Sequence, residues 1–146
     1  RLSEGVYILR EKKTTGGWER GFAELIPREA EPGQSGTSNR NFVLNEDGQN
    51  AVRITLYRGR GEEDPLMTPL VSVKFDFKRS YPRGTRIGLR WRLDRNKKIR
   101  VEGWLVDYPD EKPFVLEVEG SYLSEEELEE LRANSLCEVN KRRGDS

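Results

Sequence analysis

The chain has 146 residues, with 26 Lys and Arg against 26 Asp and Glu, no His and a single Cys. Its length fits one ordinary domain, and a formal net charge of zero leaves no overall field to steer it toward nucleic acid or a membrane. The absence of His excludes imidazole catalysis and His metal sites, and one Cys excludes an internal disulfide or a Cys-cluster zinc site.

Alternation of apolar and polar residues with a period of two predicts short β-strands along most of the chain. The predicted strands are residues 6–9, 22–26, 42–44, 52–57, 71–78, 86–93, 99–106 and 114–118. One-sided alternation is typical of antiparallel sheets with a solvated outer face. About eight such strands predict a mainly β fold, an antiparallel β-sandwich. The apolar run that follows Gly103 predicts a β-bulge there.

Turns and one helix complete the predicted elements. Turn residues lie at 16–17, 45–48, 59–61 and 94–96, and the polar stretch 29–41 is predicted to be a loop. Ser124 and Glu127 form a capping box, which predicts a short helix near the C-terminus. The predicted organisation is therefore a β-sandwich over 1–121, a helix over 122–136 and a disordered tail over 137–146.

Catalytic and phosphate-binding motifs are not recognisable in this sequence. The Gly pairs match no phosphate loop, and the acidic residues are best explained as solvated surface. Arg86, Arg90 and Arg92 share one predicted strand face, but Trp91 lies on the opposite face. A nucleic-acid base could not stack on Trp91 while its phosphate met those arginines. A solvated strand face is the better interpretation. The longest apolar run is four residues, so none approaches the roughly 20 needed to span a bilayer.

The most informative segment is 42–54, in which two apolar strand ends enclose the polar loop Asn-Glu-Asp-Gly. The apolar side chains of this segment could belong to the core, or they could line a slot for an extended ligand. Periodicity does not decide between the two.

The order of short motifs resembles the substrate-binding domain of the 70-kDa heat-shock (DnaK-type) chaperones. The matching segments are Leu-Ile-Pro-Arg at 25–28, the hairpin 42–54, Tyr-Arg-Gly-Arg at 57–60, Pro-Arg-Gly at 82–84, 87–91, 99–101 and Leu-Ser-Glu-Glu-Glu-Leu at 123–128. The similarity covers about residues 5–133. It implies a β-sandwich that holds an extended peptide in a slot, beneath the start of a helical lid.

The resemblance also implies roles for individual residues. The residues implied to line a pocket for an apolar side chain are Val6, Ile8, Phe42, Val52, Ile54 and Ile87. Leu9 and Asn45 would arch over the peptide, and backbone groups near Leu9, Val43, Asn45 and Gln49 would bond to it. This chain departs from the family pattern in a longer, charged first loop (residues 10–18) and in the polar Asn45.

The expected function is that of a chaperone-type module binding unfolded or extended polypeptide segments. The alternatives are an interaction domain with one dedicated partner, a sheet-face binder of nucleic acid or carbohydrate, and lastly an enzyme. The chain begins at Arg1 rather than Met, so we expect a piece of a longer protein. An upstream ATPase domain and co-chaperones are the further expected partners, and ATP enters only through such a domain. We expect no cofactor, metal, nucleic acid or membrane partner, and a cytoplasmic location.

Overall fold

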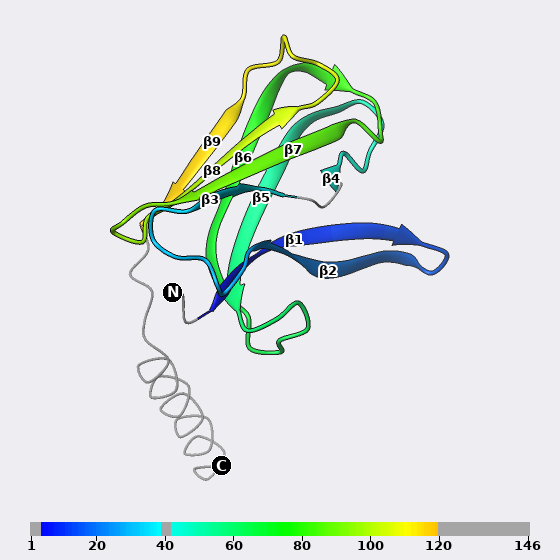
Figure 1. Cartoon of the computed structure of the whole chain (residues 1–146). Helices are drawn as coiled ribbons and strands as arrows, with labels where there is room; N and C mark the ends of the chain where they lie inside the picture. The colour runs from blue at the N-terminus through cyan, green and yellow to red at the C-terminus, as the bar shows by residue number, and fades with distance from the viewer. Residues whose placement is uncertain (1–3, 39–41, 120–146) are drawn as a thin grey trace, which may run out of the picture.

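The computed structural model describes residues 4–38 and 42–119, which form two antiparallel β-sheets (Figure 1). Sheet A has the strand order β2-β1-β5-β6, with bounds β1 Gly5–Thr14, β2 Gly17–Ile26, β5 Gln49–Gly59 and β6 Thr68–Tyr81. Sheet B has the order β3-β7-β8-β9, with bounds β3 Ser35–Thr37, β7 Arg86–Leu93, β8 Ile99–Leu105 and β9 Phe114–Val118. The two-residue β4 (Phe42–Val43) also pairs with β7.

The mainly β, antiparallel architecture predicted from the alternation is confirmed. On β7, Ile87, Leu89, Trp91 and Leu93 are buried and the arginines between them are exposed. The inward side chains of both sheets belong to one apolar cluster. The aromatic ring of Phe75 on β6, for example, lies 4.8 Å from that of Phe114 on β9, measured between ring centroids. The predicted C-terminal helix and tail lie outside the described residues. In the described ranges no helix is long and apolar enough to cross a membrane.

Two local predictions are corrected. The stretch 29–41 is not all loop, because residues 35–37 form the short strand β3 against β7. A Cβ on Gly36 would lie 2.8 Å from the indole of Trp91, so only glycine lets β3 pass this close. The predicted bulge at Gly103 is also wrong. The β7–β8 register is unbroken, and Gly103 points inward where the ring of Phe114 fills the space a side chain would need.

The end of the structure that carries the β8–β9 connection is fastened by a polar network between the two sheets. Glu111 accepts hydrogen bonds from the Tyr81 hydroxyl (2.6 Å) and from the Lys78 backbone N–H (3.1 Å). Asp110 pairs with Arg79 and Lys78, at 2.9 and 3.0 Å. Burial and the hydrogen bond to Glu111 raise the pKa of Tyr81 to about 12, and hydrogen bonds from Arg79 and Lys78 lower the pKa of Asp110 to about 2.

Sheet A is open between β1 and β5, because these two strands are paired over only part of their length. Their register covers Gly5–Ile8 against Leu56–Gly59 and stops there. Beyond Ile8, β1 continues with β2 as a two-stranded ribbon that runs away from β5 (Figure 1). Thr14 Oγ1 donates to the Gly17 carbonyl at the tip, and Gly17 takes φ 121°, so the predicted Gly-Gly turn is confirmed. The divergence of the two strands creates the candidate site.

Candidate functional site

A cavity of about 840 Å³ lies where the β1–β2 ribbon separates from β5. One wall is the ribbon, and the other is formed by β4, the β4–β5 loop and the first half of β5. Most of its apolar lining comes from segments that are distant in sequence but share the core-facing side of the two sheets. These lining residues are Ile8, Ala23, Phe42, Leu44, Val52, Ile54, Ile87 and Leu89.

The depth of the cavity follows from the same alternation that builds the core. Ile54 is only 3% exposed and belongs to the core cluster, whereas Val52, two residues closer to the loop on the same face, is half-buried. Phe42 is likewise half-buried on β4. The cavity therefore begins where the core ends. Its inner end is apolar, whereas its outer part is lined by polar and charged residues such as Arg10, Asn45 and Glu46.

The rims of the cavity are strand edges without a neighbouring strand. After Ile8, β1 pairs only with β2, and residues 49–55 of β5 pair only with β6 in the described part of the chain. Unpaired N–H and C=O groups along such edges are free to hydrogen-bond an added extended segment. The cavity thus combines an apolar pocket with main-chain hydrogen-bonding capacity on both sides.

The β4–β5 loop is held in place by its own side chains. The Gln49 side-chain oxygen accepts from the backbone N–H groups of Asn45 and Glu46, each at 3.2 Å, and its nitrogen donates to the Ala51 carbonyl at 2.8 Å. Asp47 accepts from the Arg83 backbone N–H at 3.2 Å. Gly48 takes φ 65°, the conformation in which glycine is favoured in a tight turn. The Gln49 side chain therefore shapes the loop and is not available to a ligand.

Nine of the ten residues predicted for the site line this cavity: Ile8, Leu9, Phe42, Val43, Asn45, Gln49, Val52, Ile54 and Ile87. Val6 does not line it. It is 0% exposed and belongs to the core. It lies two residues before Ile8 on the same face of β1, where β1 is still paired with β5. The structure thus brings together a set of residues that spans 80 positions of the sequence, from Ile8 to Ile87.

Sequence reasoning missed eleven of the twenty lining residues, among them Arg10, Ala23 and Arg53. Arg10 carried a usable signal, since it continues the alternation of Val6 and Ile8 and must share their face. Ala23 lies opposite Ile8 and Arg53 opposite Lys74. Those neighbours depend on pairing registers that a single sequence does not reveal.

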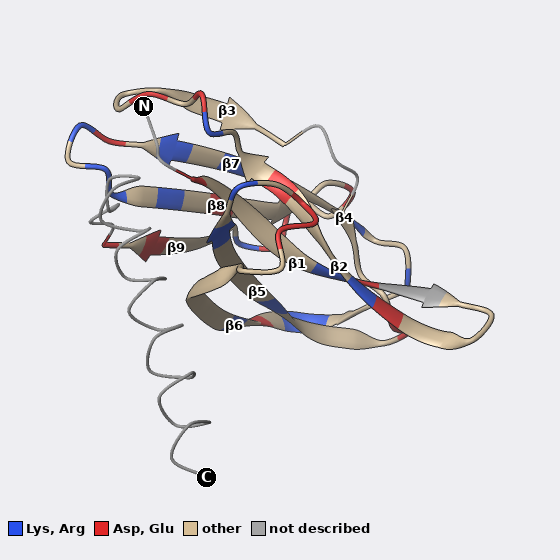
Figure 2. Cartoon of the chain, turned by 90° about the horizontal axis from the view of Figure 1, so that it is seen from below, with Lys and Arg blue, Asp and Glu red and all other residues tan. Residues whose placement is uncertain are grey.

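The outer face of sheet B carries an aromatic that the sequence analysis did not place there. Trp104 lies across Gly88, where a Cβ would meet the indole, and the Arg90 guanidinium lies 5.7 Å from the Trp104 ring. The cations of this face, marked in Figure 2, are mostly neutralised. Arg86 pairs with Asp107 at 2.6 Å, and Arg90 with Glu102 at 2.8 Å.

Within residues 4–38 and 42–119 no group of three or more His, Cys, Asp or Glu side chains is arranged to hold a metal ion. No protein-family model and no curated protein matches the sequence of this chain.

Proposed function

We propose that this chain is a chaperone-type peptide-binding module that holds short, extended, apolar segments of unfolded polypeptides. The observation that carries the proposal is a cavity with an apolar inner end that lies between two strand edges without partner strands among the described residues. Main-chain bonds to such edges accept any peptide sequence, and a pocket for one side chain adds the preference for apolar residues. The resemblance to the DnaK-type substrate-binding domain supports the same function.

Each part of the cavity has a role in this proposal. Ile8, Val52 and Ile54 form the floor and sides of the pocket for a Leu- or Ile-like side chain. Leu9 and Asn45 line the rim and would lie over the peptide. The bonding groups are backbone N–H and C=O groups, so binding requires an extended segment and no particular residue besides the apolar one.

The chain itself is proposed to be a binding module and not an enzyme. In this proposal ATP acts only through a separate nucleotide-binding domain of a longer protein, and co-chaperones join through that protein. We place it in the cytoplasm, because one Cys among 146 residues gives no sign of the oxidising compartments where disulfides persist. Nucleic acid is not a proposed partner, since the arginines of the outer face of sheet B are largely paired with carboxylates.

A second candidate is an interaction domain with one dedicated protein partner. The observation that favours it is the polar rim, in which Asn45, Glu46 and Arg10 surround an apolar pocket. Such a rim is typical of a site that selects among ligands.

A peptide panel separates these two functions. Fluorescence anisotropy would be measured with labelled seven-residue peptides that carry Leu, Ile, Ser or Asp at the centre and varied flanks. The proposed function predicts saturable binding of many Leu- and Ile-centred peptides and none of the Ser- and Asp-centred ones. A prolyl residue next to the Leu should weaken binding, because it removes a backbone N–H. Absence of binding to every peptide would refute the module and favour the dedicated partner.

A further inference from the structure

The cavity carries an asymmetric distribution of charge that the proposed function does not use. Four of its lining residues are ionisable: Arg10, Glu11, Glu46 and Arg53. Glu11 is already paired, with its carboxylate 3.2 Å from Arg20. Of the other three, none forms an ion pair with a described residue. The cavity lining therefore includes two cations and one acid that form no ion pair with the described residues.

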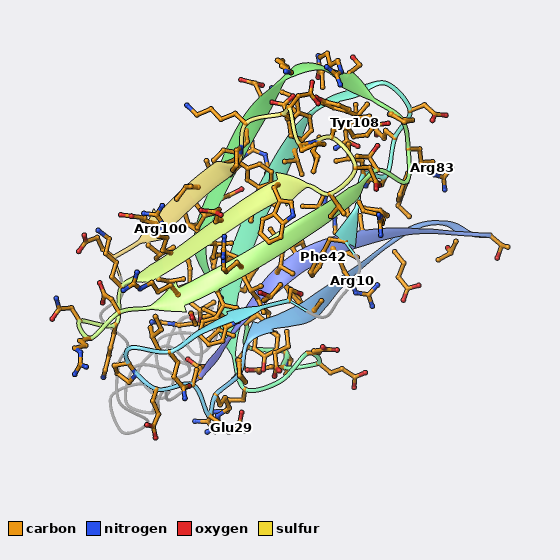
Figure 3. All side chains as sticks on the ribbon, turned by 45° about the horizontal axis from the view of Figure 1, so that its top comes forward. Arg10, Glu29, Phe42, Arg83, Arg100 and Tyr108 are labelled. Atoms are coloured by element: carbon orange, nitrogen blue, oxygen red, sulfur yellow. The ribbon has the colours of Figure 1, made fainter. Side chains whose placement is uncertain are left out.

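Of these cations, Arg10 lies closest to the apolar pocket. It follows Ile8 on the same face of β1, and same-face neighbours along a strand lie about 7 Å apart. Opposite it on β2 is Gly21. A Cβ on Gly21 would lie 3.4 Å from Arg10 Nη2, so the guanidinium lies across the ribbon over Gly21. Arg10 and Phe42, from opposite walls of the cavity, are both labelled in Figure 3.

The other cation is turned away from the pocket. Arg53 follows Val52 and precedes Ile54 on β5, so its side chain starts on the opposite face of the sheet. Its guanidinium donates to Ser72 Oγ at 3.2 Å. Glu46 lies on the β4–β5 loop with an exposed side chain. Arg10 is thus the charged group that shares a strand face with the pocket.

From this placement we infer that Arg10 determines the ligand class: extended peptides in which an acidic residue lies within one or two positions of the apolar residue in the pocket. The inference rests on the proposed peptide-binding function. A peptide carboxylate next to the pocket would meet a guanidinium that pairs with no acidic residue within 4–38 and 42–119. A lysine at that position would meet the same positive charge and bind less well.

The expected effect is modest, because Arg10 is exposed and water screens its charge. Exposed ion pairs contribute up to about 1 kcal/mol, which corresponds to roughly fivefold in affinity. The difference should shrink at high salt, because the Debye length falls from roughly 10 Å at 0.1 M to 3 Å at 1 M.

The test compares three labelled peptides that share one central Leu and carry Glu, Gln or Lys on both sides of it. Each is titrated by anisotropy against the full chain and against Arg10→Gln, Arg10→Lys, Arg53→Gln and Arg92→Gln. Arg92 is a matched control, since it is an exposed arginine on sheet B, outside the cavity lining. We expect the Glu peptide to bind roughly fivefold tighter than the Gln peptide, and the Lys peptide to bind least well. Arg10→Gln should remove this order, Arg10→Lys should restore much of it, and Arg92→Gln should leave it unchanged.

The outcomes distinguish the inference from the function beneath it. Equal binding of the three peptides to the unmodified chain would overturn the acidic preference and leave the peptide-binding function standing. A preference that survives Arg10→Gln but disappears in Arg53→Gln would overturn the assignment to Arg10. Failure of all three peptides to bind the unmodified chain would overturn the proposed function together with the inference.

Discussion

Replacing Val52 with Phe tests whether this residue lines a ligand pocket or belongs to the closed core. Val52 is half-buried and lines the cavity, on the same face of β5 as Ile54 and directly opposite Phe75 on β6. A phenyl ring in its place would extend into the cavity of about 840 Å³, and would occupy the space of a bound Leu side chain. Fully burying such a side chain contributes about 1.5–3 kcal/mol. Blocking the pocket should therefore weaken peptide binding by roughly 10- to 150-fold.

The stability of the chain should change far less than its affinity. The added ring enters open space, so we expect the free energy of unfolding to change by less than about 1 kcal/mol, whereas overpacking a closed core costs about 1–3 kcal/mol. Leu56→Phe is the matched control, because Leu56 lies on the same strand and face but is 0% exposed in the core. It should destabilise the chain by about 1–3 kcal/mol while the folded fraction keeps its affinity.

The assay combines urea denaturation of the three proteins with anisotropy of a labelled Leu-centred heptapeptide. If Val52→Phe destabilises the chain as much as Leu56→Phe and does not weaken binding, Val52 is core and the assignment of the pocket is wrong.

Three further substitutions test the structural basis of the site. Gly36→Ala places a Cβ against the indole of Trp91 and should destabilise the chain by about 1–3 kcal/mol in urea denaturation. The matched Gly16→Ala, whose Cβ would enter open space, should be nearly neutral. Equal destabilisation by the two substitutions would contradict the contact. Gln49→Ala removes three hydrogen bonds of the β4–β5 loop, so it should lower the free energy of unfolding by about 1–2 kcal/mol and weaken peptide binding. Unchanged stability and affinity would show that the loop does not need these hydrogen bonds. Asp110→Asn should lower the urea midpoint at pH 7. Because folding lowers the pKa of Asp110 to about 2, its contribution to stability is present above pH 4 and is lost as the pH falls from about 4 to 2. If the urea midpoints of the two proteins differ by the same amount at pH 2 and pH 7, the ion-pair explanation is refuted.

Strands that alternate against the core were predictable from the sequence, because burial imposes a period of two on them. The paired strand β7 is the clearest example. The outer halves of β1 and β2 were not predictable, because the ribbon that they form leaves the core and has no apolar face. The three-residue β3 is too short for any periodicity, and its place depends on the distant Trp91.

The apolar run after Gly103 shows how a correct observation led to a wrong prediction. Three apolar residues in sequence indicated a slipped phase, yet the strand is regular and Trp104 simply faces outward. Its indole is accommodated because its partner on β7 is Gly88, which has no side chain in the way. The sequence could name nine of the twenty residues that line the cavity by resemblance, but not the charged residues among them. The cavity is created where the β1–β5 pairing ends after Ile8, and that point is set by contacts between distant segments.

The proposed function requires that an extended peptide enter between the separated edges of β1 and β5. The most direct measurement is the change in backbone amide chemical shifts of the isotope-labelled chain when a Leu-centred heptapeptide is added. We predict the largest changes at Leu9 and along residues 49–55, with the amides around Trp104 on the outer face of sheet B unaffected. Changes confined to that outer face, or none at saturating peptide, would contradict the account.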